Sequence, residues 1–370
     1  MYSFPYIFVF FLLTLLCFPI IKKNNDSISF NSINFIYYYL VFLIFVVFFT
    51  FRGEVYMDWP QYKALYESAP VFSTQLDLLH LNTYGWEKGY FVFAAFCKLF
   101  SEDYFFFQVI NSIIDIILLF GVVKSYYKNQ YFCLCLLFFY CFNGLPISIN
   151  LLRNSKVIYL FLISLKYLYN KQYIKYFLLN FIAIFFHTSA VIYILLTPFF
   201  LWKKNNKKLI LSLFIIGNFL FLLRIDILSF FLNFILRLLP SGFSKIALLI
   251  DRYKDTGAYG IKIGFLERTL TFILFFRCQN DFVKEKYGNI FVKSYYIYYF
   301  CYLFLASAVT ICERIGVLFS YSYWFLYPMF YKKLNKNNKY VFWFCMVIYS
   351  VLKLYVGNRT EDYAYSNLLF

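Results

Sequence analysis

The residues of this sequence best suited to chemistry are ionisable side chains that lie within long apolar runs or at their ends. They are Arg52, Asp58, Glu87, Arg153, His187, Arg252, Glu267, Arg268, Glu313 and Arg314. An ionisable group in apolar surroundings is costly to bury and by default marks a functional site. Arginine is especially informative, because its planar guanidinium binds phosphate through paired hydrogen bonds and keeps its charge. Several arginines converging on one cavity would suit a lipid-linked diphosphate whose tail stays in the bilayer.

These residues also have structural interpretations, which the sequence leaves open. Arg52 and Asp58 could cap the end of an apolar helix at the membrane interface. Glu87 could complement the dipole of a helix that begins beside it. Arg153 could extend its charged end along its own helix toward water.

The remaining candidates are interpreted through their neighbours. His187 lies midway along an apolar segment, and its two hydroxyl-bearing neighbours break that segment. The break favours a functional histidine over one that is only satisfied by hydrogen bonds. The charged dipeptides at 267–268 and 313–314 could pair across a helix bundle. Asp115 lies inside an apolar run and is expected to bond to a neighbouring helix.

The apolar runs themselves indicate the fold class. Apolar and aromatic residues make up 62% of the 370 residues, charged residues make up 14%, and the mean hydropathy is +0.66. This composition excludes a disordered chain and an ordinary soluble domain. A hydrocarbon layer about 30 Å thick requires about 20 apolar residues per crossing helix, and the chain supplies such runs repeatedly. We therefore predict an all-α, polytopic integral membrane protein.

The net charge of +17 belongs to membrane topology. The lysines and arginines gather in short gaps between apolar runs, as expected for cytoplasmic loops that face anionic lipid. A nucleic-acid partner is therefore not predicted.

Placing the lysine-rich gaps in the cytoplasm predicts about twelve transmembrane helices (range 10–12), some of them short or re-entrant, with both ends of the sequence outside. The predicted spans are 3–21, 33–51, 104–123, 131–149, 152–168, 174–186, 188–202, 209–223, 263–277, 295–311, 315–331 and 340–356. The segment 174–202 has lysines on both sides, and its length of about 43 Å as a helix is long for one crossing and short for two. We expect it to be a bent or re-entrant pair with His187 at its tip. The alternative is one long tilted helix, which would give eleven spans and violate the lysine pattern.

The acidic residues and the longer loops lie on the side opposite the lysines. The predicted external loops are 52–103 and 224–262, and each contains an amphipathic stretch, at 87–100 and 227–239. The working face is therefore expected to be external or periplasmic. Without an internal repeat or a low-complexity linker, residues 1–370 are expected to form a single integral membrane domain.

No metal or cofactor site is expected. The chain has two histidines, His80 and His187, and lacks the C-x-x-C and H-E-x-x-H patterns of zinc sites. Most of its cysteines lie in apolar runs, where they act as small buried side chains.

Four short stretches, spread over about residues 50–330, form a pattern. They are Phe51-Arg52-Gly53 with Met57-Asp58-Trp59-x-x-Tyr62; Trp86-Glu87-Lys88-Gly89-Tyr90-Phe91; Leu152-Arg153-Asn154 with His187-Thr188-Ser189-Ala190; and Glu313-Arg314-Ile315. With these stretches the chain resembles the EpsG family of bacterial membrane proteins, which are Wzy-like O-antigen and exopolysaccharide polymerases. The pairing of Arg153 with the His187 stretch is the most specific element, and Asn154 stands where the family usually has glutamine.

The resemblance implies glycosyl transfer on the outer face of the bacterial cytoplasmic (inner) membrane. A growing glycan held on an undecaprenyl-type diphosphate would move to the non-reducing end of another lipid-linked repeat unit, without a metal or a nucleotide. The implied partners are this lipid-linked oligosaccharide, membrane lipid and a regulator of chain length.

Within that scheme the departing diphosphate needs fixed positive charge, and the attacking hydroxyl needs a general base. Arg153 is the first candidate for the charge, followed by Arg52, Arg314 and Arg268, with Arg252 and Glu313 as further binding residues. The candidates for the base are His187, Glu87 and Asp58. Aromatic residues of the first external loop could stack on sugars or form an interfacial belt. They are Tyr56, Trp59, Tyr62, Tyr66, Tyr84 and Trp86.

Two other functions use similar residues. A flippase of the same lipid-linked glycan also needs a cationic path, but it needs no base, and transporters usually show repeat symmetry and charge at mid-membrane. A ligase or other outer-face glycosyltransferase would use the same donor with a different acceptor.

Overall fold

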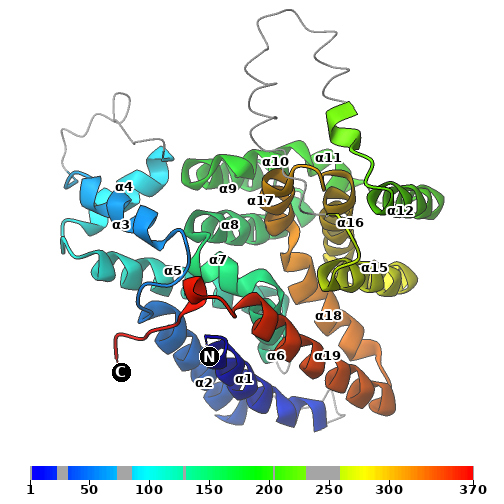
Figure 1. Ribbon diagram of the computed structural model, residues 1–370, viewed down its shortest axis with the longest axis horizontal. Coiled ribbons are helices and arrows are strands. Elements are labelled where there is room, and N and C mark those ends of the chain that lie inside the picture. The colour runs from blue at the N-terminus through cyan, green and yellow to red at the C-terminus, as the bar shows by residue number, and fades with distance from the viewer. Residues whose placement is uncertain are drawn as a thin grey trace, which may run out of the picture. The chain divides into compact units, whose positions relative to one another are not determined.

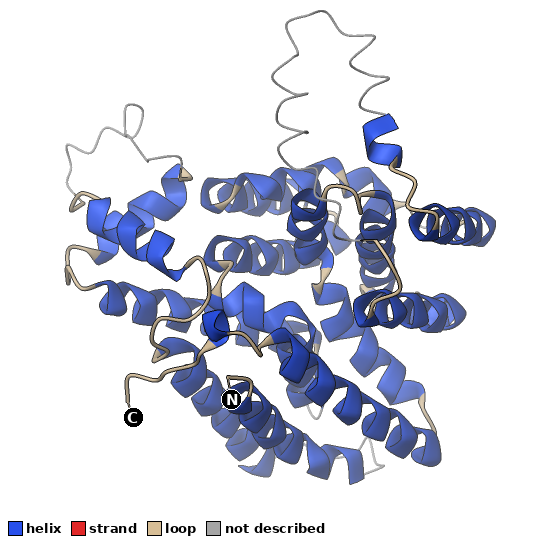
Figure 2. Ribbon diagram, in the orientation of Figure 1, coloured by secondary structure: helices blue, strands red, loops and turns tan. Residues whose placement is uncertain are grey.

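The computed structural model describes residues 2–22, 32–72, 86–127, 131–202, 205–230 and 259–369. In these ranges the chain is helical nearly throughout (Figure 2). Arg52 and Asn367 pair in an isolated antiparallel bridge. Three helical stretches in the described residues are long and apolar enough to cross a membrane, at Tyr104–Tyr126, Tyr131–Ile149 and Lys336–Gly357. The predicted all-α membrane fold is confirmed.

The chain divides into two compact units, one formed by Met1–Leu195 with Tyr327–Phe370 and the other by Leu196–Leu326. The first unit contains α1 (Phe4–Lys22), α2 (Ser32–Phe45), η1 (Val46–Thr50), α3 (Trp59–Ser68), α4 (Lys88–Cys97), α5 (Tyr104–Tyr126), α6 (Tyr131–Phe139), η2 (Tyr140–Gly144), α7 (Leu145–Ile149), α8 (Leu152–Tyr169), α9 (Tyr173–Phe186), η3 (Thr188–Ala190), α10 (Val191–Leu195), α19 (Lys336–Gly357) and η6 (Glu361–Tyr363). The second contains α11 (Thr197–Leu201), α12 (Lys207–Leu222), α15 (Ile263–Phe282), α16 (Gly288–Phe304) and α17 (Val309–Phe319). The division falls within α18 (Tyr321–Lys333).

Most predicted spans coincide with helices to within a few residues, but two late spans were placed wrongly. The predicted helix 295–311 ends at Phe304, and α17 begins at Val309. The predicted helix 315–331 is interrupted at Ser320, between α17 and α18. Neither break contains proline or glycine, so the sequence gives no helix-breaking signal at these positions. At the first break Ser307 donates from its hydroxyl to Asp226, at 2.6 Å, a tertiary contact that a linear pattern cannot reveal.

The predicted bend in segment 174–202 is confirmed. Helix α9 ends at Phe186, His187 is extended with φ −161° and ψ 129°, and η3 follows. The hydroxyl of Tyr176 donates to the carbonyl of Tyr193 at 3.2 Å. An unbroken helix would separate these residues by about 25 Å, so α10 must fold back along α9.

Rings fill the space between α3, α4 and α5. Trp59, Tyr62 and Tyr66 are buried there, together with Tyr90 of α4 and Phe107 of α5. The external-loop aromatics of α3 thus pack inside the protein, where they hold α3 and α4 against α5. Figure 1 shows these helices beside the ends of α8 and α9.

Helix α5 turns a polar stripe toward the interior of the first unit. Gln108, Asn111, Ser112 and Asp115 recur at helical spacing and are all buried. Polar side chains in a membrane helix must find partners within the protein. Those of α5 bond to the end of α2–η1 and to the start of α8, and they thereby fix the helices that carry the candidate site.

Candidate active site

Glu87, Arg153 and His187 are spread over 100 positions of the chain, and they meet at the ends of three helices in the first unit. Glu87 immediately precedes α4, Arg153 is in the first turn of α8, and His187 follows α9. Oε2 of Glu87 bonds to Nη1 of Arg153, and Oε1 bonds to Nδ1 of His187. The backbone N–H of Thr188 also donates to Oε1, at 3.3 Å. One carboxylate therefore joins three predicted site residues.

Gly89 allows this meeting. A Cβ atom at Gly89 would lie 2.6 Å from the carbonyl oxygen of Phe185, a distance at which the two helices could not pack. The first turn of α4 can therefore approach the last turn of α9 only because residue 89 has no side chain. This close approach brings Glu87 within reach of His187.

Arg153 lies against an aromatic wall. Its guanidinium carbon is 4.4 Å from the ring centre of Trp86, within the range of cation–π attraction. Its charge also interacts with Tyr62, which packs against Trp86 with ring centres 5.3 Å apart. Side-chain exposure is 25% for Arg153, 18% for His187 and 12% for Glu87. All three are partly shielded, and Arg153 and His187 remain reachable by a ligand.

Glu87 is held ionised. It lies in the predicted external loop. Its partial burial disfavours the charged form and by itself would raise its pKa. The hydrogen bond to His187 and the charge of Arg153 outweigh burial and lower the pKa of Glu87 to about 2. A carboxylate with so low a pKa is a weak base, so Glu87 is better suited to fixing its partners than to accepting a proton.

His187 retains one ring nitrogen for chemistry. Nδ1 faces Glu87, and Nε2 has no hydrogen-bond partner among the described residues. A carboxylate on Nδ1 favours the tautomer that carries its proton there, and Nε2 is then an acceptor. The adjacent turn is held by Asn154, whose side-chain oxygen accepts from the hydroxyl of Ser189 at 3.4 Å.

A buried ion pair one turn beyond Arg153 was missed by the sequence analysis. Nζ of Lys156 lies 3.0 Å from Oδ1 of Asp115 and 2.6 Å from Oδ1 of Asn111. The hydroxyl of Ser155 donates to Oδ2 of Asp115 at 2.7 Å. The expected bond from Asp115 to a neighbouring helix is confirmed, and it anchors α8 to α5. The available signal was a lysine inside an apolar run, three residues after Arg153.

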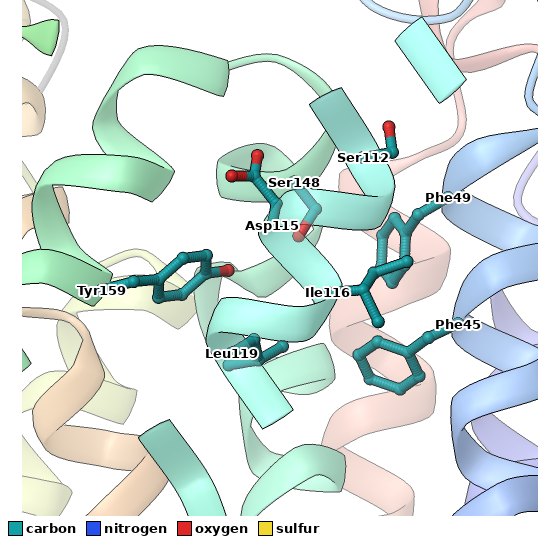
Figure 3. A pocket seen from close by; sticks show the side chains of 8 residues that line it. All are labelled: Phe45, Phe49, Ser112, Asp115, Ile116, Leu119, Ser148 and Tyr159. Atoms are coloured by element: carbon teal, nitrogen blue, oxygen red, sulfur yellow. The ribbon is translucent and has the colours of Figure 1, made fainter. Parts of the chain in front are cut away.

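A small pocket adjoins this ion pair, and Asp115 forms part of its wall (Figure 3). Ser112, Ser148 and Tyr159 are its other polar lining residues. It has room for about one water molecule, which is too little for a sugar or a phosphate.

Arg52 lies apart from the three joined residues. It is fully buried, and its Nη1 donates to the carbonyl of Phe49 and, at 3.1 Å, to the hydroxyl of Ser112. This arrangement favours the capping interpretation of Arg52. Asp58 precedes α3, and its backbone N–H donates at 3.0 Å to the side chain of Asn150, which lies just before α8. Asp58 therefore belongs to the surroundings of Arg153.

The other predicted binding residues lie in the second unit or outside the described residues. Nε of Arg268 donates to the hydroxyl of Tyr298 at 2.9 Å, and its guanidinium carbon is 4.2 Å from the ring centre of Tyr302. Glu313 and Arg314 are exposed on α17. Arg252 lies outside the described residues, as does most of the predicted loop 224–262.

No group of three or more metal-binding side chains occurs in the described part of the chain. What the first unit offers is a fixed carboxylate, a histidine with one open nitrogen and an arginine against an aromatic wall. Such a set can hold an anion and accept a proton from a hydroxyl group.

Comparison with known proteins identifies the family. The family model described as EpsG family matches residues 35–368, nearly the whole chain. No curated protein and no solved structure matches. The matched range includes the four stretches on which the resemblance rests, with Glu87, Arg153 and His187 among them. The chain is therefore a member of the EpsG family.

Proposed function

We propose that this protein polymerises cell-surface polysaccharide by joining lipid diphosphate-linked repeat units on the outer face of the bacterial cytoplasmic membrane. Membership of the EpsG family supports a polymerase-like role in polysaccharide synthesis. The proposal of glycosyl transfer rests on the contacts of the Glu87 carboxylate, whose two oxygens bond to Arg153 and to His187. These contacts hold an anion-binding group and a proton acceptor on the same carboxylate.

Arg153 binds the donor diphosphate in this proposal. One of its guanidinium nitrogens is engaged by Glu87 and its face lies on Trp86, so the group is held in one orientation before substrate arrives. Positive charge fixed in advance stabilises a leaving group that gains negative charge, without reorganisation during the reaction. The lipid tail of the donor stays in the bilayer beside the helices.

His187 accepts the proton. The acceptor hydroxyl oxygen forms a bond to the anomeric carbon of the donor glycan, and the bond from that carbon to the phosphate oxygen breaks. The electron pair leaves with the lipid diphosphate, and the hydroxyl proton moves to Nε2 of His187. Glu87 stays ionised and stabilises the imidazolium that forms, the role that a carboxylate has beside histidine in hydrolytic triads.

The histidine–carboxylate pair also weighs against the alternatives. A flippase gains nothing from an oriented base, because no bond is made during transport. A ligase would share the chemistry and differ in its acceptor. Product size therefore separates a ligase from a polymerase, and the sidedness of accumulated substrate separates a flippase from both.

The test is deletion of the gene in its own host, followed by sizing of lipid-linked and surface glycan on gels. If the protein is a polymerase, deletion should collapse the ladder to single repeat units that still reach the outer face. The wild-type gene should restore the ladder. Single repeats confined to the cytoplasmic face would instead identify a flippase. Loss of attachment to the final acceptor, with chain length intact, would identify a ligase.

A further inference from the structure

The residues that follow α19 pair with the carboxyl-terminal end of α2–η1. We call residues 359–369 the strap. The backbone N–H of Gly53 donates to the carbonyl of Ser366 at 2.9 Å, and the N–H of Leu368 donates to the carbonyl of Phe51 at 2.7 Å. These bonds flank the bridge between Arg52 and Asn367. A segment from one end of the chain is thus paired with residues more than 300 positions away.

The strap satisfies helix carbonyls that would otherwise lack partners. The last turn of α2–η1 leaves carbonyl groups without intrahelical donors, and such groups are costly at the edge of a membrane. The side chain of Asn367 donates to the carbonyl of Val47 at 3.0 Å, and the hydroxyl of Tyr365 donates to that of Phe48 at 2.7 Å. The ring of Tyr365 also stacks on that of Phe48, with centres 4.6 Å apart.

Helix α5 completes this cap from the other side. The side-chain amide of Gln108 donates to the carbonyls of Thr50, at 3.3 Å, and Arg52, at 2.6 Å. Nη1 of Arg52 reaches back to the carbonyl of Phe49. The carbonyls of residues 47–52 thereby all accept a hydrogen bond, some from the strap and the rest from Arg52 and α5.

The contact is specific in shape. A Cβ atom at Gly53 would lie 2.1 Å from the hydroxyl oxygen of Ser366 and 3.3 Å from its Cβ, so a side chain at residue 53 would fit only if the Ser366 hydroxyl were moved or removed. Farther along, the N–H of Tyr56 donates to the carbonyl of Asp362 at 3.0 Å. The strap therefore fixes the loop from the end of the second span to the beginning of α3.

That loop leads directly to the candidate site. Trp59, the first residue of α3, donates from its indole to the side chain of Gln108 at 3.0 Å. One turn later the ring of Tyr62 packs against Trp86, on which the guanidinium of Arg153 lies, and Tyr62 also interacts with the charge of Arg153. A shift of α3 would therefore change the position of the Arg153 guanidinium.

We propose that the strap positions α3, and through Tyr62 the side chains of Arg153 and Trp86, so that residues 359–369 are required for glycosyl transfer although none of them lies in the site. The effect on activity rests on the proposed function. The docking itself does not, and it is measured separately.

Docking is tested by hydrogen exchange of the purified full chain against a variant lacking residues 360–370. The amides of Gly53 and Tyr56 lose their acceptors in the truncated variant, and their exchange is expected to accelerate by about tenfold or more. Amides in the middle of α16 are the control and should be unchanged. Equal exchange at Gly53 and Tyr56 in the two proteins would overturn the proposal, whatever reaction the protein performs.

Activity is tested with point variants, because truncation could unfold the chain. Tyr365→Ala removes the ring and the hydroxyl, whereas Tyr365→Phe keeps the ring that stacks on Phe48. We expect Tyr365→Ala to lose polymer by about tenfold or more and Tyr365→Phe to recover part of that loss, each at normal protein level. Normal polymer in Tyr365→Ala would show that the strap does not position the site.

A cross-link distinguishes a strap that must stay docked from one that must leave. The Cβ position at Gly53 lies 3.3 Å from Cβ of Ser366, close to the separation in disulfides. The double variant Gly53→Cys/Ser366→Cys, in a Cys345→Ser background, should form a disulfide and remain as active when oxidised as when reduced. Activity regained only on reduction would overturn the proposal of a fixed support. If the wild-type protein makes no polymer at all, the proposed function fails while the exchange result still judges the docking.

Discussion

His187 faces Glu87 through Nδ1, and Oε1 of the carboxylate, which receives this contact, also accepts the backbone N–H of Thr188. The imidazole is thus fixed by a side chain from the beginning of α4 and by the turn that ends α9. Its other nitrogen is left for a substrate hydroxyl. This relationship makes His187, rather than Glu87 or Asp58, the base in the proposed transfer.

Replacing His187 tests that assignment. His187→Ala should lower the rate of repeat-unit joining by about 10²- to 10⁴-fold, the usual contribution of a general base. The rate is measured with purified protein and lipid-linked repeat units. His80→Ala is the matched control, because His80 is the other histidine of the chain. A similar loss in both variants, or in neither, would rule out a specific role for His187.

Two substitutions of Arg153 distinguish the effect of its charge from the effect of its planar shape. Arg153→Ala should abolish polymer and leave single-repeat product. Arg153→Lys keeps the charge but loses the planar fork, so we expect partial activity at best. Lys63→Ala, which removes an exposed cation paired with Glu67 on α3, should leave chain length unchanged. Unchanged chain length in a folded Arg153→Ala protein would remove Arg153 from the mechanism.

Glu87 predicts a dependence of stability on pH. Its pKa in the folded protein, about 2, lies below the ordinary value of 4.5, so its ionised form stabilises the folded state. That stabilisation is complete above about pH 4.5 and is lost as the pH falls toward 2. Wild type should therefore melt at a higher temperature than Glu87→Gln at pH 7, with a gap that narrows below pH 4.5. Melting of protein in detergent, followed by tryptophan fluorescence, measures the gap; a gap that widens in acid would contradict the assignment.

Substitution of Gly89 tests whether the close approach of α4 to α9 is needed to form the site. Gly89→Ala places a Cβ against the carbonyl of Phe185, so it should separate α4 from α9 and lower activity by about tenfold or more. Gly121→Ala is the matched control: Gly121 lies within α5, and a Cβ there would meet nothing within 4 Å. It should be neutral or should stabilise by about 1 kcal/mol through its helix propensity. Equal effects of the two substitutions would refute the argument.

The buried pair of Lys156 and Asp115 predicts strong coupling. Lys156→Met alone leaves a buried carboxylate without its cation and should destabilise the protein by about 3–5 kcal/mol. The double variant Lys156→Met/Asp115→Leu should recover most of that loss, because an apolar pair of similar volume needs no desolvation. Chemical unfolding of the two single variants and the double variant gives the coupling free energy. A sum of independent effects would show that the pair does not interact.

The sequence by itself determined the membrane class and much of the helix layout. Hydropathy indicates a helix wherever about 20 apolar residues run together, since the bilayer imposes this length whatever the partners. The break at His187 was also visible, because polar residues interrupt an apolar run there. The convergence of Arg153 with His187 was expected from the family resemblance and not from spacing along the chain.

The tertiary structure decided the roles. Arg52 and Arg153 are the same kind of residue at the ends of apolar runs, yet one caps a helix inside the protein and the other lies at an open site. Which of them meets a carboxylate depends on helix packing, and in particular on the close approach that Gly89 permits. The strap and the buried Lys156 depend likewise on contacts between distant segments. A linear pattern records which side chains are costly to bury, but only packing in three dimensions determines which partner offsets that cost.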